Sequence, residues 1–140
     1  MNKAQLIDKL RQIEAQEKRE LIDKHLPAFR EKYVGKYFKL RNSYGASGSP
    51  WFMYVRVDSI ESGNIIIYSH DNVQASFKGV SFQADCNGKI MIDTEYFSYA
   101  NIIGEEITED EFRTAWNELQ EKLKAIIKTE EATIGKEQDT

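Results

Sequence analysis

The stretch VSFQADCNGKIMIDTEYF, residues 80–97, alternates apolar and polar side chains on both sides of a central Asn-Gly pair. Alternation with a period of two is typical of half-buried β-strands, and Asn-Gly is a strong signal for a tight turn between two of them. The stretch therefore predicts an antiparallel hairpin, and with it a fold built around a sheet.

The length of the turn sets the register of this hairpin. A three-residue loop, Cys86-Asn87-Gly88, pairs Phe82 with Ile92 and keeps apolar side chains on one face, whereas a two-residue loop would set Phe82 opposite Asp93. The longer loop also puts Gly88 at the left-handed position that such turns require. We therefore predict the three-residue loop.

Five segments rich in β-branched and aromatic residues, separated by Gly, Ser and Asn, predict five strands. The second and third are expected to pair with each other through a loop Glu61-Ser62-Gly63, which sets Val57 opposite Ile67 and again places glycine third. The five segments cover residues 34–42, 51–60, 64–71, 80–86 and 89–97.

The pairing of the second strand with the third gives this hairpin two different faces. One face is apolar and is assigned to the core. The other is rich in aromatic residues, so it needs either a covering helix or a binding partner. The core face holds Trp51, Met53, Val55, Val57, Ile65 and Ile67, and the aromatic face holds Phe52, Tyr54, Arg56, Asp58, Ile66, Tyr68 and His70, with Tyr54 across from His70.

Residues 2–32 predict an amphipathic helix, because apolar side chains recur every three or four residues from Leu6 to Phe29. Pro27 is expected to kink or restart it. Residues 15–20 carry no large apolar side chain, so we expect this part to project into solvent or to lie along a partner. The residues expected to support self-association are Leu6, Leu10 and Ile13.

A second helix is predicted to begin after Thr108, which forms a capping box with Glu111 and is bracketed by the hydrophobic pair Ile107 and Phe112. Its apolar side chains follow a four, three, four, three spacing, which makes a stripe that must pack against something. Beyond Lys128 the apolar content is low, and a frayed tail is expected. The stripe consists of Phe112, Trp116, Leu119, Leu123 and Ile126.

Together these segments predict an α+β fold. It consists of a small five-stranded antiparallel sheet or open barrel, of SH3-like or OB-like size, flanked by N-terminal and C-terminal amphipathic helices. We divide the chain into an N-terminal helical segment (1–32), a barrel-like domain with the C-terminal helix (33–128) and a flexible acidic tail (129–140).

The composition is that of a soluble globular protein, with 41% hydrophobic and 30% charged residues. No apolar run approaches the ~20 residues of a membrane span, and the charged N-terminal residues do not resemble a secretory signal. The single cysteine, Cys86, cannot form an internal disulfide. A reducing cytoplasm is therefore the expected location.

Residues that carry chemistry are few and scattered. His25, His70 and Cys86 lie at least sixteen residues apart, unlike the ligands of a structural zinc site. Phosphate-binding, dinucleotide-binding and nucleophile-elbow motifs are missing from the sequence. We therefore predict no catalytic residues, no metal site and no cofactor, and expect the protein not to be an enzyme.

Nucleic-acid binding is the first alternative. Small barrels bind single strands by stacking bases on aromatic side chains beside a positive groove. The charge balance argues against this alternative, because binding to phosphates needs an excess of positive charge. Residues 33–104 carry six basic and six acidic side chains, and residues 105–140 carry five basic and eleven acidic ones. That acidic region also suits docking on a basic partner. The residues for the nucleic-acid alternative are Lys36, Lys39, Arg41 and Arg56, with Tyr37, Tyr44, Phe52 and Tyr54.

Protein binding is the function that the sequence favours. The loop of residues 42–51 has an aromatic side chain at its centre and another at its exit, like a binding tip. A second alternative is a small ligand or nucleotide held beside Tyr54 and His70. The residues predicted to bind a partner are Tyr44, Trp51, Phe52, Tyr54, Arg56, Tyr68 and His70.

The phrases GKYFKLRNSY (35–44) and ITEDEF (107–112) resemble small accessory proteins encoded by bacteriophages and prophages. The resemblance covers residues 33–127 and leaves out the N-terminal helix. It implies a protein made in an infected bacterium, where inhibitors that bind host defence proteins are common at this size. We therefore expect a protein-binding module that acts on a bacterial host protein and forms a homodimer through its helices.

Overall fold

The computed structural model describes residues 1–42, 51–85 and 88–138 of the 140-residue chain. Within these ranges, two long helices lie at the two ends of the chain and six strands lie between them. In chain order the elements are α1 (Lys3–Tyr33), β1 (Tyr37–Asn42), β2 (Trp51–Ser59), the 3₁₀ helix η1 (Ser62–Asn64), β3 (Ile65–Ser69), β4 (Asn72–Ala84), β5 (Ile90–Tyr99), η2 (Ala100–Ile102), β6 (Glu105–Ile107) and α2 (Glu109–Gln138).

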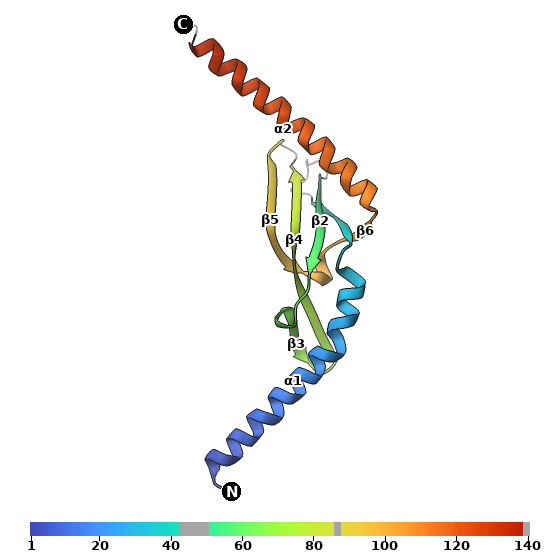
Figure 1. Cartoon of the computed structure of the whole chain (residues 1–140), viewed down its shortest axis with the longest axis vertical. Coiled ribbons are helices and arrows are strands. Elements are labelled where there is room, and N and C mark those ends of the chain that lie inside the picture. Colours follow the sequence, from blue (N-terminus) through green and yellow to red (C-terminus); the bar gives the residue numbers. More distant parts are fainter. Residues whose placement is uncertain (43–50, 86–87, 139–140) are drawn as a thin grey trace.

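The strands form one antiparallel sheet in the order β3-β4-β2-β1-β6, with β5 also paired to β4. β4 organises the sheet, since its first part pairs with β3 and its second part lies between β2 and β5. Figure 1 shows β3 at one end of the sheet, beyond β2 and β5. The expected α+β fold is confirmed, as an open sheet with six described strands where the sequence predicted five.

The predicted register of the β4–β5 hairpin is confirmed. Phe82 pairs with Ile92 and Ala84 pairs with Ile90. The backbone N–H of Asp85 donates to the carbonyl of Lys89 at 2.9 Å. Gly88 has a φ of 78°, the left-handed conformation that the three-residue loop requires. Cys86 and Asn87 lie outside the described residues.

The predicted hairpin between β2 and β3 is wrong. β2 pairs with β1 and β4, while β3 pairs with β4 through a two-residue turn after Ser69. The chain leaves β2 through η1, where the Glu61 backbone N–H donates to the side-chain oxygen of Asn64 at 2.9 Å. The guanidinium of Arg30 on α1 donates to the Ile60 carbonyl at 2.8 Å and ion-pairs with Glu61 at 3.1 Å. These contacts turn β3 away from β2.

One face of the sheet packs on the C-terminal half of α1. The side chains of Val55, Val57 and Phe77 are fully buried there, and the partly buried α1 residues Leu26 and Phe29 pack against them. The predicted core face of β2 is therefore confirmed at its centre. The buried members of this core are Tyr33, Phe38, Val55, Val57, Ile60, Ile65, Ala75, Phe77, Ala100 and Ile103.

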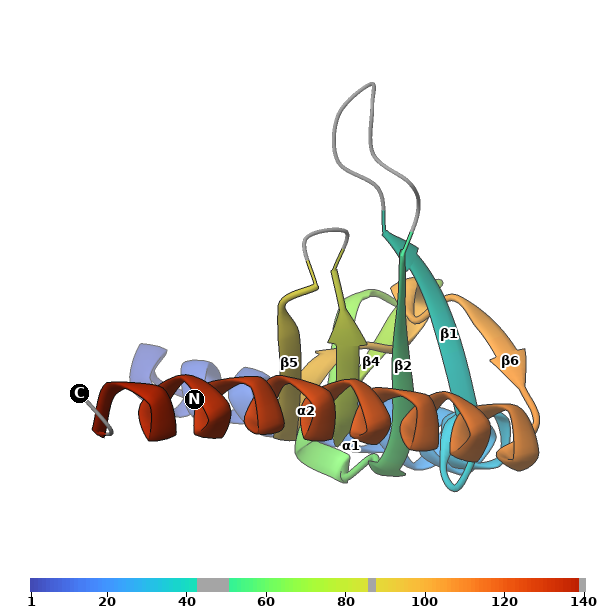
Figure 2. The ribbon, with the colours of Figure 1, turned by 90° about the horizontal axis from the view of Figure 1, so that it is seen from above.

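The opposite face of the sheet packs on the N-terminal half of α2. Phe112 and Leu119 from the helix are buried against Phe82 from β4. The predicted helix start is confirmed, because the Thr108 hydroxyl accepts from the Glu111 backbone N–H at 3.1 Å. Figure 2 shows α2 running across the strands.

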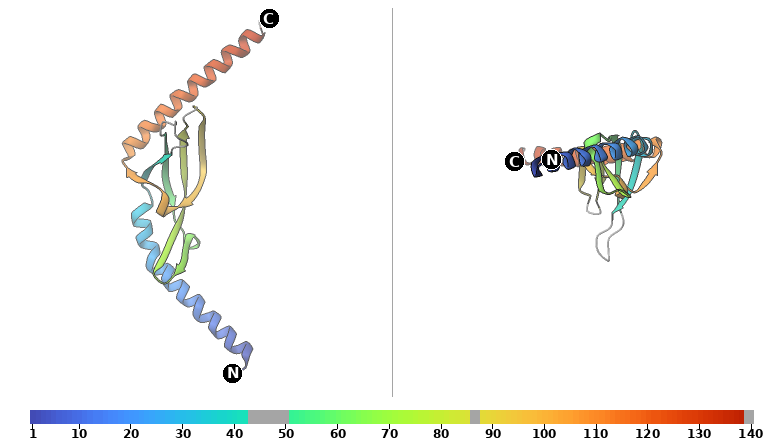
Figure 3. Two further views of the ribbon diagram at one scale, coloured as in Figure 1. Left: turned by 180° about the vertical axis from the view of Figure 1, so that it is seen from behind. Right: turned by 90° about the horizontal axis from the view of Figure 1, so that it is seen from below.

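Each helix extends far beyond the sheet. Figures 1 and 3 show the N-terminal half of α1 and the C-terminal half of α2 projecting from opposite ends of the sheet, so that the molecule is long and bowed. Residues 3–20 of α1 are exposed throughout. α1 continues without a break through Pro27, so the expected restart is absent. Figures 1 and 3 show the helix changing direction along its length, which agrees with the alternative of a kink.

The predicted frayed tail differs from the structure, because α2 continues through residues 129–138. The threonine hydroxyls in these turns bond back to helix carbonyls. The hydroxyl of Thr129 donates to the Ala125 carbonyl and that of Thr133 to the Thr129 carbonyl, each at 3.0 Å. Sequence reasoning judged these residues by their low apolar content, whereas alanine, lysine and glutamate favour helix without burial.

Candidate binding site between the sheet and α2

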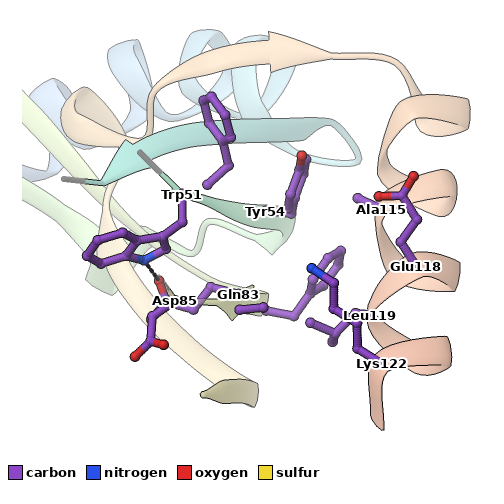
Figure 4. A pocket seen from close by; sticks show the side chains of 11 residues that line it. Trp51, Tyr54, Gln83, Asp85, Ala115, Glu118, Leu119 and Lys122 are labelled. Carbon is purple, nitrogen blue, oxygen red and sulfur yellow. Dashed lines mark hydrogen bonds between the residues drawn. The ribbon is translucent and has the colours of Figure 1, made fainter. Parts of the chain in front are cut away.

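A pocket of about 310 Å³ lies where α2 crosses the ends of β2 and β4. The sheet contributes aromatic side chains, and α2 closes the pocket from the other side, with Glu118, Leu119 and Lys122 facing Tyr54 and Gln83 (Figure 4). Its lining residues are Trp51, Phe52, Tyr54, Phe82, Gln83, Ala84, Asp85, Ala115, Glu118, Leu119 and Lys122.

Stacked aromatic rings form the apolar wall of the pocket. Tyr54 stacks on Phe82 with ring centroids 5.3 Å apart, and Phe82 meets Phe112 at 5.1 Å and Trp116 at 5.2 Å. Neighbouring aromatic rings gain energy beyond the area that they bury, so this cluster holds α2 firmly against β4. The pocket wall is therefore preformed.

Polar groups flank the aromatic wall of the pocket on both sides (Figure 4). The indole N–H of Trp51 donates to the side-chain oxygen of Gln83 at 3.2 Å, which fixes the ring against β4 (Figure 4). Glu118 and Lys122 supply one charge of each sign from successive turns of α2. The pocket thus joins an apolar wall to a polar rim, as is typical of sites that receive a side chain or a small ligand.

The side chain of Lys39 on β1 contacts both Phe52 of the pocket and Glu111 of α2. Its ammonium lies 3.2 Å from the Glu111 carboxylate, 3.5 Å from that of Glu105 and 4.7 Å from the centre of the Phe52 ring. The hydrogen bond to Glu111 raises the pKa of Lys39 above 10.5, partly offset by burial and supported by both carboxylates. The ammonium therefore stays charged and holds Phe52 in place.

Burial raises the pKa of the Tyr54 phenol above 10.0. The nearby Lys39 ammonium acts in the opposite direction, and the carboxylates of Glu111 and Glu118 add to the rise. Tyr54 is therefore neutral at any physiological pH, and its hydroxyl can donate or accept a hydrogen bond.

The structure brings together three of the predicted partner-binding residues. Trp51, Phe52 and Tyr54 line this pocket. Arg56 lies on the same strand but lines a neighbouring apolar cavity of about 460 Å³. The Asp58 carboxylate pairs with Arg56 at 2.7 Å and raises the pKa of its guanidinium.

The other predicted partner-binding residues lie elsewhere. Tyr68 and His70 belong to the β3–β4 end of the molecule, where the Tyr68 side chain is 63% exposed. The expected pairing of Tyr54 with His70 is wrong, since Tyr54 pairs with Lys39 and Phe82. Because β3 does not pair with β2, no single aromatic surface joins them. Tyr44 lies outside the described residues.

Sequence reasoning missed the part of the pocket that α2 supplies. Ala115, Glu118 and Lys122 flank the predicted apolar stripe of this helix, and Phe82 was assigned to the β4–β5 hairpin alone. The stripe itself was the available signal. A helix with such a stripe had to cover a face, and the aromatic face of β2 was the one left open.

The apolar stripe of α2 continues beyond the sheet. Its first half is covered, with Phe112 8% and Leu119 5% exposed. From the next turn onward the apolar side chains are uncovered, and Figure 1 shows this half of α2 extending past the strands. The uncovered residues are Leu123 at 36%, Ile126 at 41%, Ile127 at 45% and Ile134 at 53%. We call these four residues the α2 stripe.

The residues predicted for self-association are also exposed. Leu6 and Leu10 are each 51% exposed and Ile13 is 45% exposed. They lie on the part of α1 that projects from the sheet (Figure 1).

Three of the four basic side chains predicted for nucleic-acid binding, those of Lys36, Lys39 and Arg56, pair with carboxylates. Lys36 lies 3.7 Å from Glu106, and Lys39 and Arg56 have the partners described above. Pairing of this kind leaves little free positive charge to neutralise phosphates.

Within the described ranges, no group of three or more His, Cys, Asp or Glu side chains lies close enough to hold a metal ion. Neither helix, over its described length, contains a stretch long and apolar enough to cross a membrane. Comparisons of the chain with protein family models, with curated proteins and with solved structures found no match.

Proposed function

We propose that this chain is a non-enzymatic protein-binding module that docks an amphipathic helix of its partner on α2. The partner helix lies along the α2 stripe and places one large apolar or aromatic side chain in the pocket beside Tyr54. The observation that carries the proposal is the continuation of a single apolar stripe from the covered half of α2, at Leu119, to its uncovered half, from Leu123.

The uncovered half of α2 needs such a partner. Side chains such as Leu123 and Ile126 are 36% and 41% exposed and belong to neither hydrophobic cluster of the described residues. Burying an aliphatic side chain of this size gains about 1.5–3 kcal/mol, so several of them provide a docking energy that the chain alone does not use.

A helix is the partner structure that fits this surface. The α2 stripe presents side chains at the three- and four-residue spacing that complements the apolar face of a second helix. The pocket adjoins the stripe at Leu119 and Lys122 and has room for one aromatic side chain. A deeply seated anchor beside a flatter apolar surface is common in helix-in-groove recognition.

The expected partner is a protein of a bacterial host, and the proposed effect is inhibition of a host defence protein in the bacterial cytoplasm. This part of the proposal is supported by the resemblance to bacteriophage accessory proteins over residues 33–127. The acidic balance of residues 105–140 favours a partner helix with basic flanks.

A second candidate is a small planar ligand in the pocket. It is favoured by the stacked rings of Tyr54 and Phe82 and by the polar rim at Glu118 and Lys122. Such a ligand would copurify with the protein and would be lost when Tyr54→Ala opens the stack, whereas substitutions on the α2 stripe would leave it bound.

The test is affinity capture from bacterial lysate with three tagged proteins. The wild type is compared with the double variant Leu123→Asp/Ile126→Asp and with Ala125→Asp, which adds the same kind of charge to an exposed position on the other side of the helix. We expect one protein to be captured by the wild type and by Ala125→Asp and to be lost with the double variant. Equal capture by all three, or no captured protein, contradicts the proposal.

A further inference from the structure

The N-terminal part of α1 buries no side chain against the rest of the chain, although from Glu14 onward it lies beside β3, where Glu14 and Glu17 line a cavity with Ile65–Ile67. Residues 3–20 are exposed throughout, and Figures 1 and 3 show them projecting away from the sheet. Isolated helices of about this length are marginal in water, because little tertiary packing offsets the cost of ordering them. A helix at this position is stable when another surface covers it.

This segment carries its own stripe, separate from the one that packs on the sheet. The stripe consists of three apolar residues, Leu6, Leu10 and Ile13, with one charged residue at each end, Lys3 and Glu17. Successive members of the stripe are three, four, three and four residues apart. At about 100° per residue, Phe29, which packs on the sheet core, lies roughly a quarter turn around the helix from Leu10. The sheet therefore does not compete for the N-terminal stripe.

The order of residues along this stripe is complementary to itself in the antiparallel direction. When a second helix is laid antiparallel with Leu10 facing Leu10, Lys3 meets Glu17 at each end, and Leu6 comes within one residue of the level of Ile13 between them. In a parallel pair, Lys3 would face Lys3 and Glu17 would face Glu17, which costs binding energy. The two halves of the segment also differ in net charge. Residues 1–11 carry three basic and one acidic side chain, whereas residues 12–23 carry two basic and four acidic ones, so an antiparallel pair sets the basic half of one helix beside the acidic half of the other.

The length of the free segment fits the same arrangement. Leu10 stands at the middle of the exposed segment, and α1 reaches the core at the partly buried Ile22. An antiparallel overlap centred on Leu10 therefore pairs residues 3–17 of each copy, and its C-terminal end reaches the cavity that Glu14 and Glu17 line with Ile65–Ile67 of β3. The two sheets come to lie at opposite ends of the helical pair.

We propose that residues 3–17 of α1 pair with the same residues of a second copy as an antiparallel two-helix coiled coil, with Leu10 at the two-fold axis and Lys3 facing Glu17. The dimer is isologous, so it closes on itself and leaves the α2 stripe of each copy free. This inference does not depend on the docking site on α2.

The first experiment measures the mass of the full chain in solution by sedimentation or light scattering over a range of concentrations. The wild type is expected to approach twice 16.2 kDa at high concentration. Leu10→Asp should weaken the dimer by about a hundredfold or more, because both copies bury a carboxylate at the axis. Gln12→Asp, which adds a charge on the far side of the helix, should leave the dimer intact.

The second experiment tests the direction of the pair by exchanging charges. Lys3→Glu alone and Glu17→Lys alone should each weaken the dimer by roughly three- to tenfold, since like charges then face each other at both ends. The double variant Lys3→Glu/Glu17→Lys should restore wild-type affinity. A parallel pair would instead tolerate either single change.

Circular dichroism checks that each variant keeps its fold at a concentration where the wild type is monomeric. A wild type that stays monomeric at every concentration overturns the proposal. A dimer that survives Leu10→Asp overturns it as well. A dimer that responds to Leu10→Asp but not to Lys3→Glu overturns the antiparallel orientation.

Discussion

At the scale of single residues, the close approach of β2 and β4 depends on Gly79. A Cβ atom at this position would lie 2.0 Å from the backbone oxygen of Arg56, which is much shorter than a van der Waals contact. Glycine is required there by space, since its φ is not in the left-handed region. Gly63, which the sequence placed in a left-handed turn, has ordinary backbone geometry and open space around it.

These two glycines give a matched prediction. Gly79→Ala should destabilise the fold by about 3 kcal/mol, because the backbones of β2 and β4 must separate to admit the methyl group. Gly63→Ala should change the free energy of unfolding by less than about 1 kcal/mol, since nothing blocks it. Urea unfolding of both variants measures the difference. Equal effects would contradict the described packing of β2 on β4.

Tyr54 gives a prediction about alkaline pH. Burial raises the pKa of its phenol above 10.0, so the folded state favours the neutral form. The stability that this contributes is complete below pH 10.0 and is lost as the pH rises through the higher folded pKa, where the phenolate forms in the pocket. Tyrosinate absorbance should show one phenol of the native protein ionising late. Tyr54→Phe should remove that step, and an unchanged titration curve would show that Tyr54 is not shielded.

At the scale of elements, α2 divides into a half that builds the fold and a half that does not. The boundary lies within one turn, because Leu119 is 5% exposed and Leu123 is 36% exposed on the same stripe. The aromatic cluster around Phe82 ends at this boundary.

This boundary predicts unequal effects from the same substitution. Leu119→Ala should cost about 2–4 kcal/mol of unfolding free energy, because it leaves a cavity against Phe82. Leu123→Ala should cost under about 1 kcal/mol, because its side chain touches solvent in the free chain. Denaturant unfolding of dilute protein compares the two. A large loss from Leu123→Ala would mean that the chain itself covers the α2 stripe.

The elements also show how far the sequence predicts the fold. The β4–β5 register was predictable because the alternation around Gly88 allows only one apolar face. The partner of β2 was not, because the run Ile65–Ile67 of β3 is apolar on both faces and suits pairing with either β2 or β4. In the structure both edges of β2 are occupied, by β1 and by β4, and the chain after β2 is held by the contact from Arg30 to the Ile60 carbonyl, thirty positions away.

The candidate site was partly predictable for the same reason. Phe52 and Tyr54 alternate on one face of β2, so their proximity required only local information. Trp51 was assigned to the other face, yet it also lines the pocket at the end of the strand. Tyr68 and His70 were added through the wrong pairing of β3. The lining from Glu118 and Lys122 depended on where α2 crosses the sheet, and that is set by packing on Phe82.

At the scale of the whole molecule, a central sheet unit carries two projecting helical arms (Figure 1). The hydrophobic clusters that hold the sheet take their helical contributions from Ile22 onward in α1 and up to Leu119 in α2. Since the arms add nothing to these clusters, we propose that they serve contacts outside the chain and that the sheet unit is the cooperative fold.

This division predicts the outcome of removing one arm. Deleting residues 2–20 should leave the midpoint of denaturant unfolding of dilute protein nearly unchanged, because those residues bury no side chain. Far-ultraviolet circular dichroism should show the loss of helix alone. A deletion that unfolds the sheet would contradict the assignment of the core to the remaining residues.

The central claim is that the α2 stripe docks a protein, and photo-cross-linking tests it most directly. A photoreactive amino acid replaces Leu123 on the stripe or, in a control, Ala125 on the other side of the helix, and each protein is irradiated in bacterial lysate. The account predicts one discrete protein adduct from position 123 and none from position 125. Equal adducts from both positions, or no adduct from position 123, would contradict it.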